Sequence, residues 1–355
     1  MSELLEYKCP NCGGGLEFSS ELQKMKCPYC ESVFEMEEFI HKDEALGEEQ
    51  PEPSNESQWE AEDGLKVYSC ESCGAQIITQ ETTGATHCPY CDNPIVMKGS
   101  FAGELKPDLV IPFKLDKKEV MKQLSEHLKG KKLLPSVFKD QHHIEEVKAI
   151  YVPYWLFDGT AKGTLHATGK VNGAVIRHGD YLHHHYKLYD ITRSGNMSFT
   201  NVPVDGSKKL DDALMQSLEP FHMEDAVDFQ TAYLAGYLAD RYDVDQTEGF
   251  QIGKARMRNS LDTHLRSTVT GYSSVDYKSG NQASVTPDGC KYALYPVWIL
   301  DTKWNGETYR FAMNGQTGKF VGDLPMDKKK FWFGLFARMI GYTVVSGTIL
   351  GLIFG

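Results

Sequence analysis

Two pairs of cysteine knuckles constrain this chain more than any other feature. Cys9-Pro-Asn-Cys12 is followed by Cys27-Pro-Tyr-Cys30, and the pattern returns as Cys70-Glu-Ser-Cys73 and Cys88-Pro-Tyr-Cys91, with the same separation between the two turns. A Cys-x-x-Cys turn brings two thiolates together, and two such turns supply the tetrahedral sulfur site that Zn²⁺ favours. The spacing therefore predicts two zinc ribbons. The expected ligands are Cys9, Cys12, Cys27 and Cys30 for one zinc ion, and Cys70, Cys73, Cys88 and Cys91 for a second.

The chemistry of four cysteines leaves some alternatives open. An iron site or a redox dithiol uses the same spacing, and the two copies can exchange one knuckle each. Four protein ligands leave no open position, so we expect structural rather than catalytic zinc. A ribbon this small cannot hold a core unaided, so zinc would supply much of its folding free energy. The ninth cysteine, Cys290, is expected to be a small buried residue in a strand.

Charge divides the chain into two parts. The formal net charge is −12, but residues 1–100 carry −14 and residues 101–355 carry +2. Residues 37–66 hold eleven Asp and Glu and are expected to form a solvated acidic linker between ribbon 1 (1–36) and ribbon 2 (67–100). Binding to nucleic-acid phosphates needs a basic surface, so this acidic setting argues against nucleic acid as a partner of the ribbons.

Residues 105–325 are expected to form one α+β domain with an internal repeat. Val152-Pro-Tyr-Trp-Leu-Phe-Asp158 returns later in the chain as Tyr295-Pro-Val-Trp-Ile-Leu-Asp301. A helical pattern precedes each copy, over residues 116–128 and 245–265, and alternating strands follow. We infer two helix-plus-antiparallel-sheet units, although a chance match of two apolar motifs would look the same. In the connecting insert, residues 210–218 and 231–241 are expected to be helical.

The C-terminus has the pattern of a membrane anchor. Three lysines, Lys328 to Lys330, precede an aromatic stretch, and the last seventeen residues carry no charge. Residues 331–355 as one helix would be about 37 Å long, enough to cross a hydrocarbon core of roughly 30 Å. The basic residues predict a cytoplasmic N-terminal bulk and a single-pass anchor in the cell membrane. A buried C-terminal helix is the alternative.

A histidine run, His183-His184-His185, is the one feature that suggests a further site. On a strand, His183 and His185 share a face and can share a metal ion, but only Asp180 and Asp190 lie near as further ligands. The chain has no Walker loop, no His-Glu-x-x-His and no Gly-x-Ser-x-Gly motif. The N-terminus also has no apolar signal-peptide core, so a reducing cytosol is expected for the thiols. We expect no catalytic residues and no enzymatic activity.

Several of these motifs together resemble a known family. They are the tandem ribbons, Val110-Ile-Pro-Phe-Lys-Leu-Asp116, Tyr151-Val-Pro-Tyr-Trp-Leu-Phe-Asp158, Phe311-Ala-Met-Asn-Gly-Gln-Thr-Gly318 and the hydrophobic tail. They resemble the Gram-positive bacterial membrane proteins described as "TFIIB-type zinc ribbon-containing". The resemblance implies that the eight ribbon cysteines bind two zinc ions. It also implies association with a phage-shock protein A homologue and an SPFH-domain protein under envelope stress.

Three function classes compete for this sequence. The first is a membrane-anchored adaptor whose zinc ribbons bring cytosolic partner proteins to the membrane, and the acidic ribbons and the tail favour it. The second is a nucleic-acid-binding or transcription-associated protein, as the ribbon type suggests. The third is an enzyme that uses His183 and His185. We expect the adaptor and keep the nucleic-acid-binding protein as the alternative.

Overall fold

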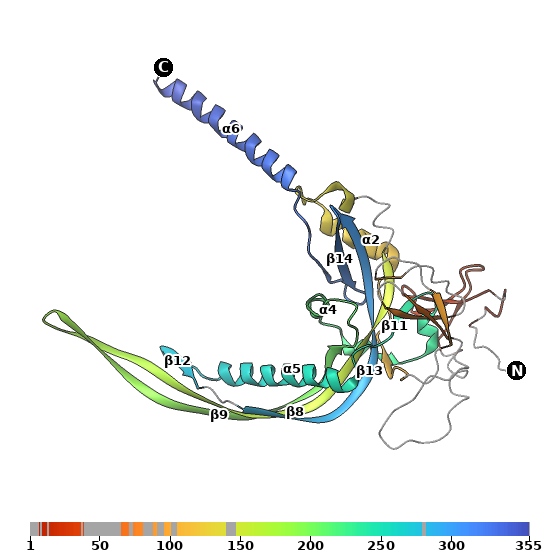
Figure 1. The fold of residues 1–355 in the computed structure, drawn as a ribbon, viewed down its shortest axis with the longest axis horizontal. Coiled ribbons are helices and arrows are strands. Elements are labelled where there is room, and N and C mark those ends of the chain that lie inside the picture. Colours follow the sequence, from red (N-terminus) through yellow and green to blue (C-terminus); the bar gives the residue numbers. More distant parts are fainter. Residues whose placement is uncertain are drawn as a thin grey trace.

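Two long antiparallel strands organise the molecule. The computed structural model describes residues 7, 9–12, 14–36, 38, 65–70, 74–80, 88–90, 96–100, 105–139, 147–278 and 282–354. In it, β8 (Lys148–His178) pairs with β13 (Gln282–Trp304) in a mixed α+β fold (Figure 1). Residues 150–157 are all buried, so both faces of β8 are covered there. This double burial explains why the apolar motifs in these strands are continuous instead of alternating.

The two copies of the apolar motif meet only at their first residues, because β8 and β13 are antiparallel. Val152 pairs with Tyr295, its counterpart in the second copy. The short strand β7 (Leu109–Val110) then pairs in parallel with β13, and β11 (Leu238–Asp240) pairs in parallel with β8. Leu109 is opposite Ala293 and Leu238 is opposite Ile150. Ile150 and Ala293 occupy the same position relative to the two motif copies, so the two short strands pair at equivalent places. Each short strand therefore joins the long strand of the other half.

One helix precedes each long strand, and each begins at an aspartate. Asp116 caps α2 (Lys117–Leu128) and Asp245 caps α5 (Gln246–Ser267), each accepting a hydrogen bond of 2.7 Å from the backbone N–H three residues on. These residues have the spacing of a capping box, with glutamate at the third helical position. Helix α5 lies along the sheet with one buried stripe. Its members are Gly249, Gly253, Met257, Leu261 and Leu265.

The remaining elements extend this frame. β9 (Tyr181–Asp205) forms a hairpin with β8, and β14 (Glu307–Asn314) forms one with β13. Around them lie β10 (Val227–Asp228), β12 (Ser274–Tyr277), β15 (Phe320–Gly322), α4 (Asp212–Leu218) and three short 3₁₀ helices, η2 (Ser136–Lys139), η3 (Met223–Asp225) and η4 (Thr231–Leu234).

The helix expected over residues 231–241 is wrong. The segment makes one 3₁₀ turn, η4, and then becomes strand β11. Gly236 separates the two with a φ of 85°, a left-handed conformation that interrupts a helix. The segment also supplies β11 as the bridge between β8 and β5 (Gln76–Gln80), a pairing that local helix propensity cannot anticipate.

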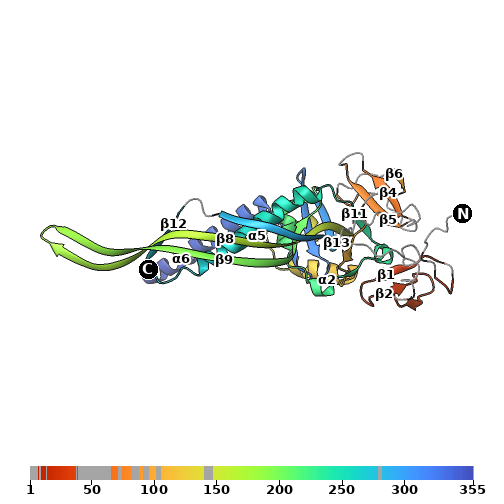
Figure 2. The same cartoon turned by 90° about the horizontal axis from the view of Figure 1, so that it is seen from below.

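The β8–β9 hairpin continues far beyond the body of the molecule. We call residues 172–190 the arm, and every one of them is exposed. The arm ends in a two-residue turn between His178 and Tyr181, where Gly179 has a φ of 58°. Figure 2 shows the arm at one end of the molecule and the N-terminal β-strands at the other.

Both N-terminal modules contact the body of the molecule. In the first, β1 (Glu17–Ser19), β2 (Lys24–Lys26) and β3 (Val33–Phe34) form a small antiparallel sheet. In the second, β4 (Leu65–Ser69) pairs with β5 and with β6 (Val96–Ser100), and β5 pairs with β11 of the central sheet. The expected acidic linker, residues 37–66, lies outside the described residues apart from Glu38, Leu65 and Lys66.

The expected transmembrane anchor over residues 331–355 is wrong, and with it the predicted single-pass localisation in the cell membrane. Helix α6 (Lys328–Phe354) forms and extends away from the body (Figure 1), but among the described residues no helix has the length and apolarity that crossing a bilayer requires. Four cationic residues occupy its first eleven positions, the last being Arg338. The charge-free remainder of α6, residues 339–354, is about 24 Å long at 1.5 Å per residue, shorter than a core of roughly 30 Å.

Candidate metal centre

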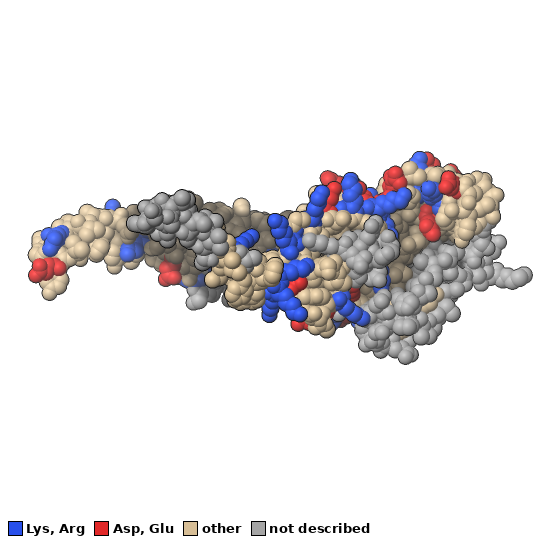
Figure 3. Space-filling model, turned by 90° about the horizontal axis from the view of Figure 1, so that it is seen from above, with Lys and Arg blue, Asp and Glu red and all other residues tan. Residues whose placement is uncertain are grey.

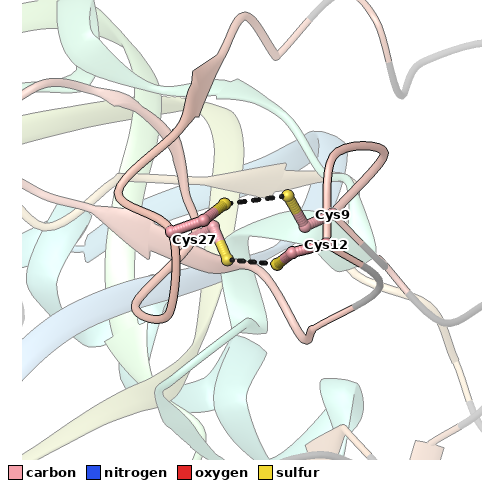
Figure 4. A group of neighbouring side chains, drawn as sticks. Cys9, Cys12 and Cys27 are labelled. Atoms are coloured by element: carbon pink, nitrogen blue, oxygen red, sulfur yellow. Dashed lines mark hydrogen bonds between the residues drawn. The ribbon is translucent and has the colours of Figure 1, made fainter.

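The four cysteines of the first module meet at one point. Their sulfur atoms all lie within 4.8 Å of one another, and the side chains point toward a shared centre (Figure 4). The Sγ atoms of Cys9 and Cys30 are 3.5 Å apart, as are those of Cys12 and Cys27. Sulfur atoms around a tetrahedral zinc ion with 2.3 Å bonds lie about 3.8 Å apart. The cluster therefore fits one Zn²⁺, as the sequence predicts for these four residues.

Local backbone hydrogen bonds position the two knuckles. The N–H of Cys9 donates to the carbonyl of Gly14 at 2.7 Å, and that of Cys27 donates to the carbonyl of Ser32 at 2.9 Å. Each bond closes a tight turn around its Cys-x-x-Cys sequence. A cross-knuckle bond from Asn11 Nδ2 to Ser32 Oγ, 2.9 Å long, ties the two turns together. The site is therefore prepared by turns that the sequence can form locally.

The thiols differ in acidity because their surroundings differ. Hydrogen bonding to Ser32, whose Oγ is 3.3 Å from the sulfur, lowers the pKa of Cys30 to about 6. A backbone hydrogen bond at Gly14 acts to lower the pKa of Cys12, but contacts with Cys27 and Cys30 outweigh it and raise that pKa to about 12. Cys30 thus ionises more readily than Cys12, and metal binding must displace the proton of Cys12.

One side of the first module is attached to the body of the molecule. Tyr7 Oη lies 2.5 Å from Thr231 Oγ1, and the N–H of Phe18 donates to the carbonyl of Ala235 at 3.1 Å. The ring of Phe18 packs edge-on against that of Tyr233, with centroids 5.1 Å apart. The sequence indicates Tyr7 and Phe18 only as parts of the ribbon itself, because their partners lie in a distant part of the chain.

The second module repeats part of this geometry. The N–H of Cys70 donates to the carbonyl of Ala75 at 2.8 Å, the counterpart of the Cys9–Gly14 bond in the first module. Cys70 and Cys88 are both buried. The other two expected ligands, Cys73 and Cys91, lie outside the described residues. The described residues therefore include one four-cysteine cluster and two of the four cysteines expected in a second.

The second knuckle of the second module is hydrogen-bonded to side chains of the body. The carbonyl of Tyr90 accepts a hydrogen bond from Arg310, which also forms a bidentate pair with Asp301 at 2.7 and 2.8 Å. Lys148 Nζ donates to the carbonyl of Cys88 at 3.3 Å. Asp301 and Arg310 are directly opposite in the β13–β14 hairpin, so their pairing follows from its register. The contact of Arg310 with the knuckle of the second module does not follow from that register.

The histidines and Cys290 are separate from the cysteine cluster. His183 lies beside His178, with ring centroids 5.6 Å apart, and His184 pairs with Val175 across the strands. The sequence pattern suggests His183 with His185 and gives no sign of His178, which only the hairpin register brings close. Cys290 is in β13, half-buried, and burial raises its pKa to about 12.

A hollow of about 830 Å³ lies between α4 and the β14–β15 hairpin. Its polar lining residues are Asp211, Ser217, Tyr309, Arg310 and Asp323. Because the Arg310 guanidinium is already paired with Asp301, the carboxylates of Asp211 and Asp323 dominate the charge of this hollow. Its lining thus suits a cationic group, and through Arg310 it adjoins the second module.

Comparison with known proteins gives one informative match. No protein-family model matches the chain, and no solved structure does. The chain is 32% identical over 355 residues to a protein of Bacillus subtilis (strain 168) named "Uncharacterized protein YdjG", and the alignment covers 99% of each chain. That relative comes from a Gram-positive bacterium, as the resemblance implies. At this identity over essentially the whole length, the chain belongs to the family of YdjG.

Proposed function

We propose that this protein is a non-enzymatic, zinc-stabilised adaptor that binds partner proteins through the exposed knuckles of its first ribbon. The second ribbon is the structural one. In this proposal the protein holds cytosolic partners together and takes no part in bond chemistry. The resemblance in sequence makes a phage-shock protein A homologue and an SPFH-domain protein the first partners to test, in an envelope-stress response.

The contrast between two equivalent tyrosines carries this proposal. Tyr29 and Tyr90 occupy the same place in the second knuckle of each module. Tyr29 is 77% exposed, whereas Tyr90 is 4% exposed and its knuckle is covered by Arg310 and Lys148. An exposed aromatic ring on a rigid turn is a common anchor for a protein partner. In the described part of the chain, the second knuckle of the first ribbon is therefore exposed, whereas that of the second ribbon is covered by the body.

Charge indicates the kind of partner. The described part of the first ribbon exposes Glu17, Glu21, Glu31 and Glu35, while Lys24 is paired with Glu35. A zinc ion with four thiolates adds a formal charge of −2. Pro10 and Pro28, one in each knuckle of this ribbon, are exposed as well. This surface suits a basic protein segment with an apolar residue that packs on the tyrosine ring.

A second zinc ion is part of the proposal. Two of its four expected ligands, Cys70 and Cys88, are buried, and the repeated knuckle hydrogen bond supports the same local fold. Zinc at this position would hold β4 and β5 against β11. Its role is structural, since its surroundings are taken up by the body of the molecule.

Partner capture by the full chain tests the adaptor role. The immobilised protein is mixed with the purified phage-shock protein A homologue of the same organism, and Tyr29→Ala is compared with the wild type. We expect a loss of capture of at least about tenfold, because the anchor ring is removed while the knuckle backbone stays. The matched control is Leu22→Ala, an exposed position on another turn of the same ribbon, which should capture normally.

Zinc content must be measured in both variants, since the Tyr29 ring packs over Gly14 and also supports the ribbon. Unchanged capture by a zinc-loaded Tyr29→Ala protein would contradict the proposal. Tight binding of the wild type to duplex DNA at physiological salt would instead favour the nucleic-acid alternative.

A further inference from the structure

The tip of the arm concentrates histidine. Four of the twelve histidines in the chain fall within positions 178–185, and all four are exposed. His178 precedes the terminal turn, and His183, His184 and His185 follow it on the returning strand. Charged side chains gather over the middle of the molecule and are sparse along the arm (Figure 3). Imidazole groups therefore outnumber carboxylates at this end, where Asp180 in the turn is the one acidic residue of positions 172–185.

The hairpin register places two of these rings together. His178 is opposite Tyr181 and Ile176 is opposite His183, so His178 and His183 are diagonal neighbours on one face of the arm. Their ring centroids are 5.6 Å apart and the rings are almost perpendicular, at 89°. The turn between them is fixed by Gly179, whose carbonyl accepts a 3.0 Å hydrogen bond from Arg177 Nε.

The opposite face of the arm has different chemistry. His184 is opposite Val175, and Arg177 is opposite Leu182, so these four residues share the other face. The positively charged Arg177 is therefore on the opposite face from His178 and His183. His185 is two residues from His183 and belongs to the same face as His183. Three of the four tip histidines are consequently on one face.

We propose that this face of the arm tip binds a divalent transition-metal ion of the Zn²⁺ type, with His178 and His183 as its two first ligands. Among the described residues no third His, Cys or carboxylate is grouped with these two, so water fills the remaining positions. Neutral imidazole nitrogens bind such ions at about 2.0–2.1 Å, which a small rotation of neighbouring rings can reach.

This site would differ in kind from the cysteine cluster. Two neutral nitrogens bind zinc far more weakly than four thiolates, so the ion would exchange. The tip and the first ribbon lie at opposite ends of the molecule (Figure 2), so the two sites would fill independently. The inference does not depend on the adaptor role, because it concerns other residues and another ligand.

Zinc titration of the full chain tests the proposal. The protein is first loaded with zinc until its cysteine sites are full, and ZnCl₂ alone is then added in a calorimeter. We expect one further, weaker binding event. His178→Ala and His183→Ala should each weaken it by roughly tenfold or more, since even the loss of a supporting group around a metal commonly costs about 10–100-fold.

His184→Ala is the matched control, because it removes one imidazole from the same run on the opposite face. It should leave the affinity within about twofold of the wild type, and His185→Ala should give a smaller loss than His183→Ala. An absence of zinc binding beyond the cysteine sites would overturn the proposal. So would an equal loss in His184→Ala, which would mean unspecific binding to exposed histidines.

Discussion

At the scale of single residues, Asp240 shows how the second module is joined to the body. Its side chain is buried in β11, where Ser207 Oγ donates to Oδ2 at 2.6 Å and the Tyr90 phenol lies alongside. Burial raises the pKa of Asp240 to about 7, although hydrogen bonds from its neighbours act to lower it. A carboxyl in this state is protonated in the folded protein at a pH where it is ionised in the unfolded chain.

Asp240 should therefore make stability depend on pH. Because the folded-state pKa lies above the ordinary value of 3.8, folding takes up a proton, and stability falls as the pH rises from about 4 to about 7. The full cost above pH 7 is on the order of 4 kcal/mol. We expect Asp240→Asn to lose this dependence and to be more stable than the wild type at pH 8. Urea unfolding at pH 5 and pH 8 measures it.

The control for this prediction is Asp262→Asn, at a half-exposed carboxylate on α5 that pairs with Arg266. It should keep the pH dependence of the wild type, including any part that comes from the cysteines. If Asp240→Asn loses as much stability between pH 5 and pH 8 as the wild type does, the buried carboxyl is not the cause.

Residues that act locally are the ones that the sequence predicts well. The knuckles of Cys9 and Cys27 close through hydrogen bonds to residues five positions on, and Asp116 and Asp245 cap helices through bonds three positions on. Asp240 and Tyr90 are far apart in the chain, and their meeting depends on the pairing of β5 with β11. No local pattern encodes that pairing, so the sequence indicates Tyr90 only as part of a ribbon.

At the scale of elements, close contact between α5 and β8 depends on glycine. A Cβ at Gly253 would lie 2.9 Å from Cδ2 of Phe157, and one at Gly249 would lie 3.1 Å from Cδ1 of Trp155. In an exposed helix, replacing glycine by alanine stabilises by up to about 1 kcal/mol. At Gly253 the ring of Phe157 would have to move to make room for the added methyl group, so alanine is expected to destabilise the protein here.

We expect Gly253→Ala to lower the free energy of unfolding by roughly 1–3 kcal/mol, the usual cost of overpacking a core. Chemical denaturation followed by tryptophan fluorescence measures it, since Trp155 lies in the same interface. Gly334→Ala is the control, because a Cβ there would meet nothing within 4 Å. An equal or higher stability of Gly253→Ala would show that α5 can shift away from the sheet without cost.

Elements follow the sequence where periodicity decides, and depart from it where the topology decides. The stripe of Val120, Leu124 and Leu128 on α2 is buried as its spacing predicts. In contrast, the segment 231–241 makes a 3₁₀ turn and ends in strand β11, because residues 238–240 pair with both β5 and β8. The sequence also does not predict the exposure of the arm. Its alternating pattern predicts a strand, but it does not show that both faces of that strand are exposed.

At the scale of the whole molecule, both N-terminal modules converge on one segment of the body, residues 231–240. The first contacts it through Phe18 and Tyr7, and the second pairs with it through β5. The same segment continues into β8 through parallel pairing. The sequence predicts modules on an acidic linker, whereas the described contacts make them part of the core.

This convergence predicts that zinc stabilises the body as well as the ribbon. Without zinc the first ribbon loses much of its folding free energy, and its contacts to Thr231, Tyr233 and Ala235 are lost with it. Local opening then requires less free energy, and amide hydrogens exchange faster. In Cys27→Ser, we expect hydrogen exchange to rise in peptides that span residues 229–241, while those of the arm stay as in the wild type.

The comparison with Cys88→Ser separates the two modules. That change removes a ligand of the second expected zinc, so it should release β5 and raise exchange at β11, residues 238–240, more than at η4. Mass spectrometry under native conditions counts the zinc ions, and each variant should hold one fewer than the wild type. If Cys27→Ser loses its zinc and exchange across residues 229–241 does not change, the first ribbon rests on the body without stabilising it.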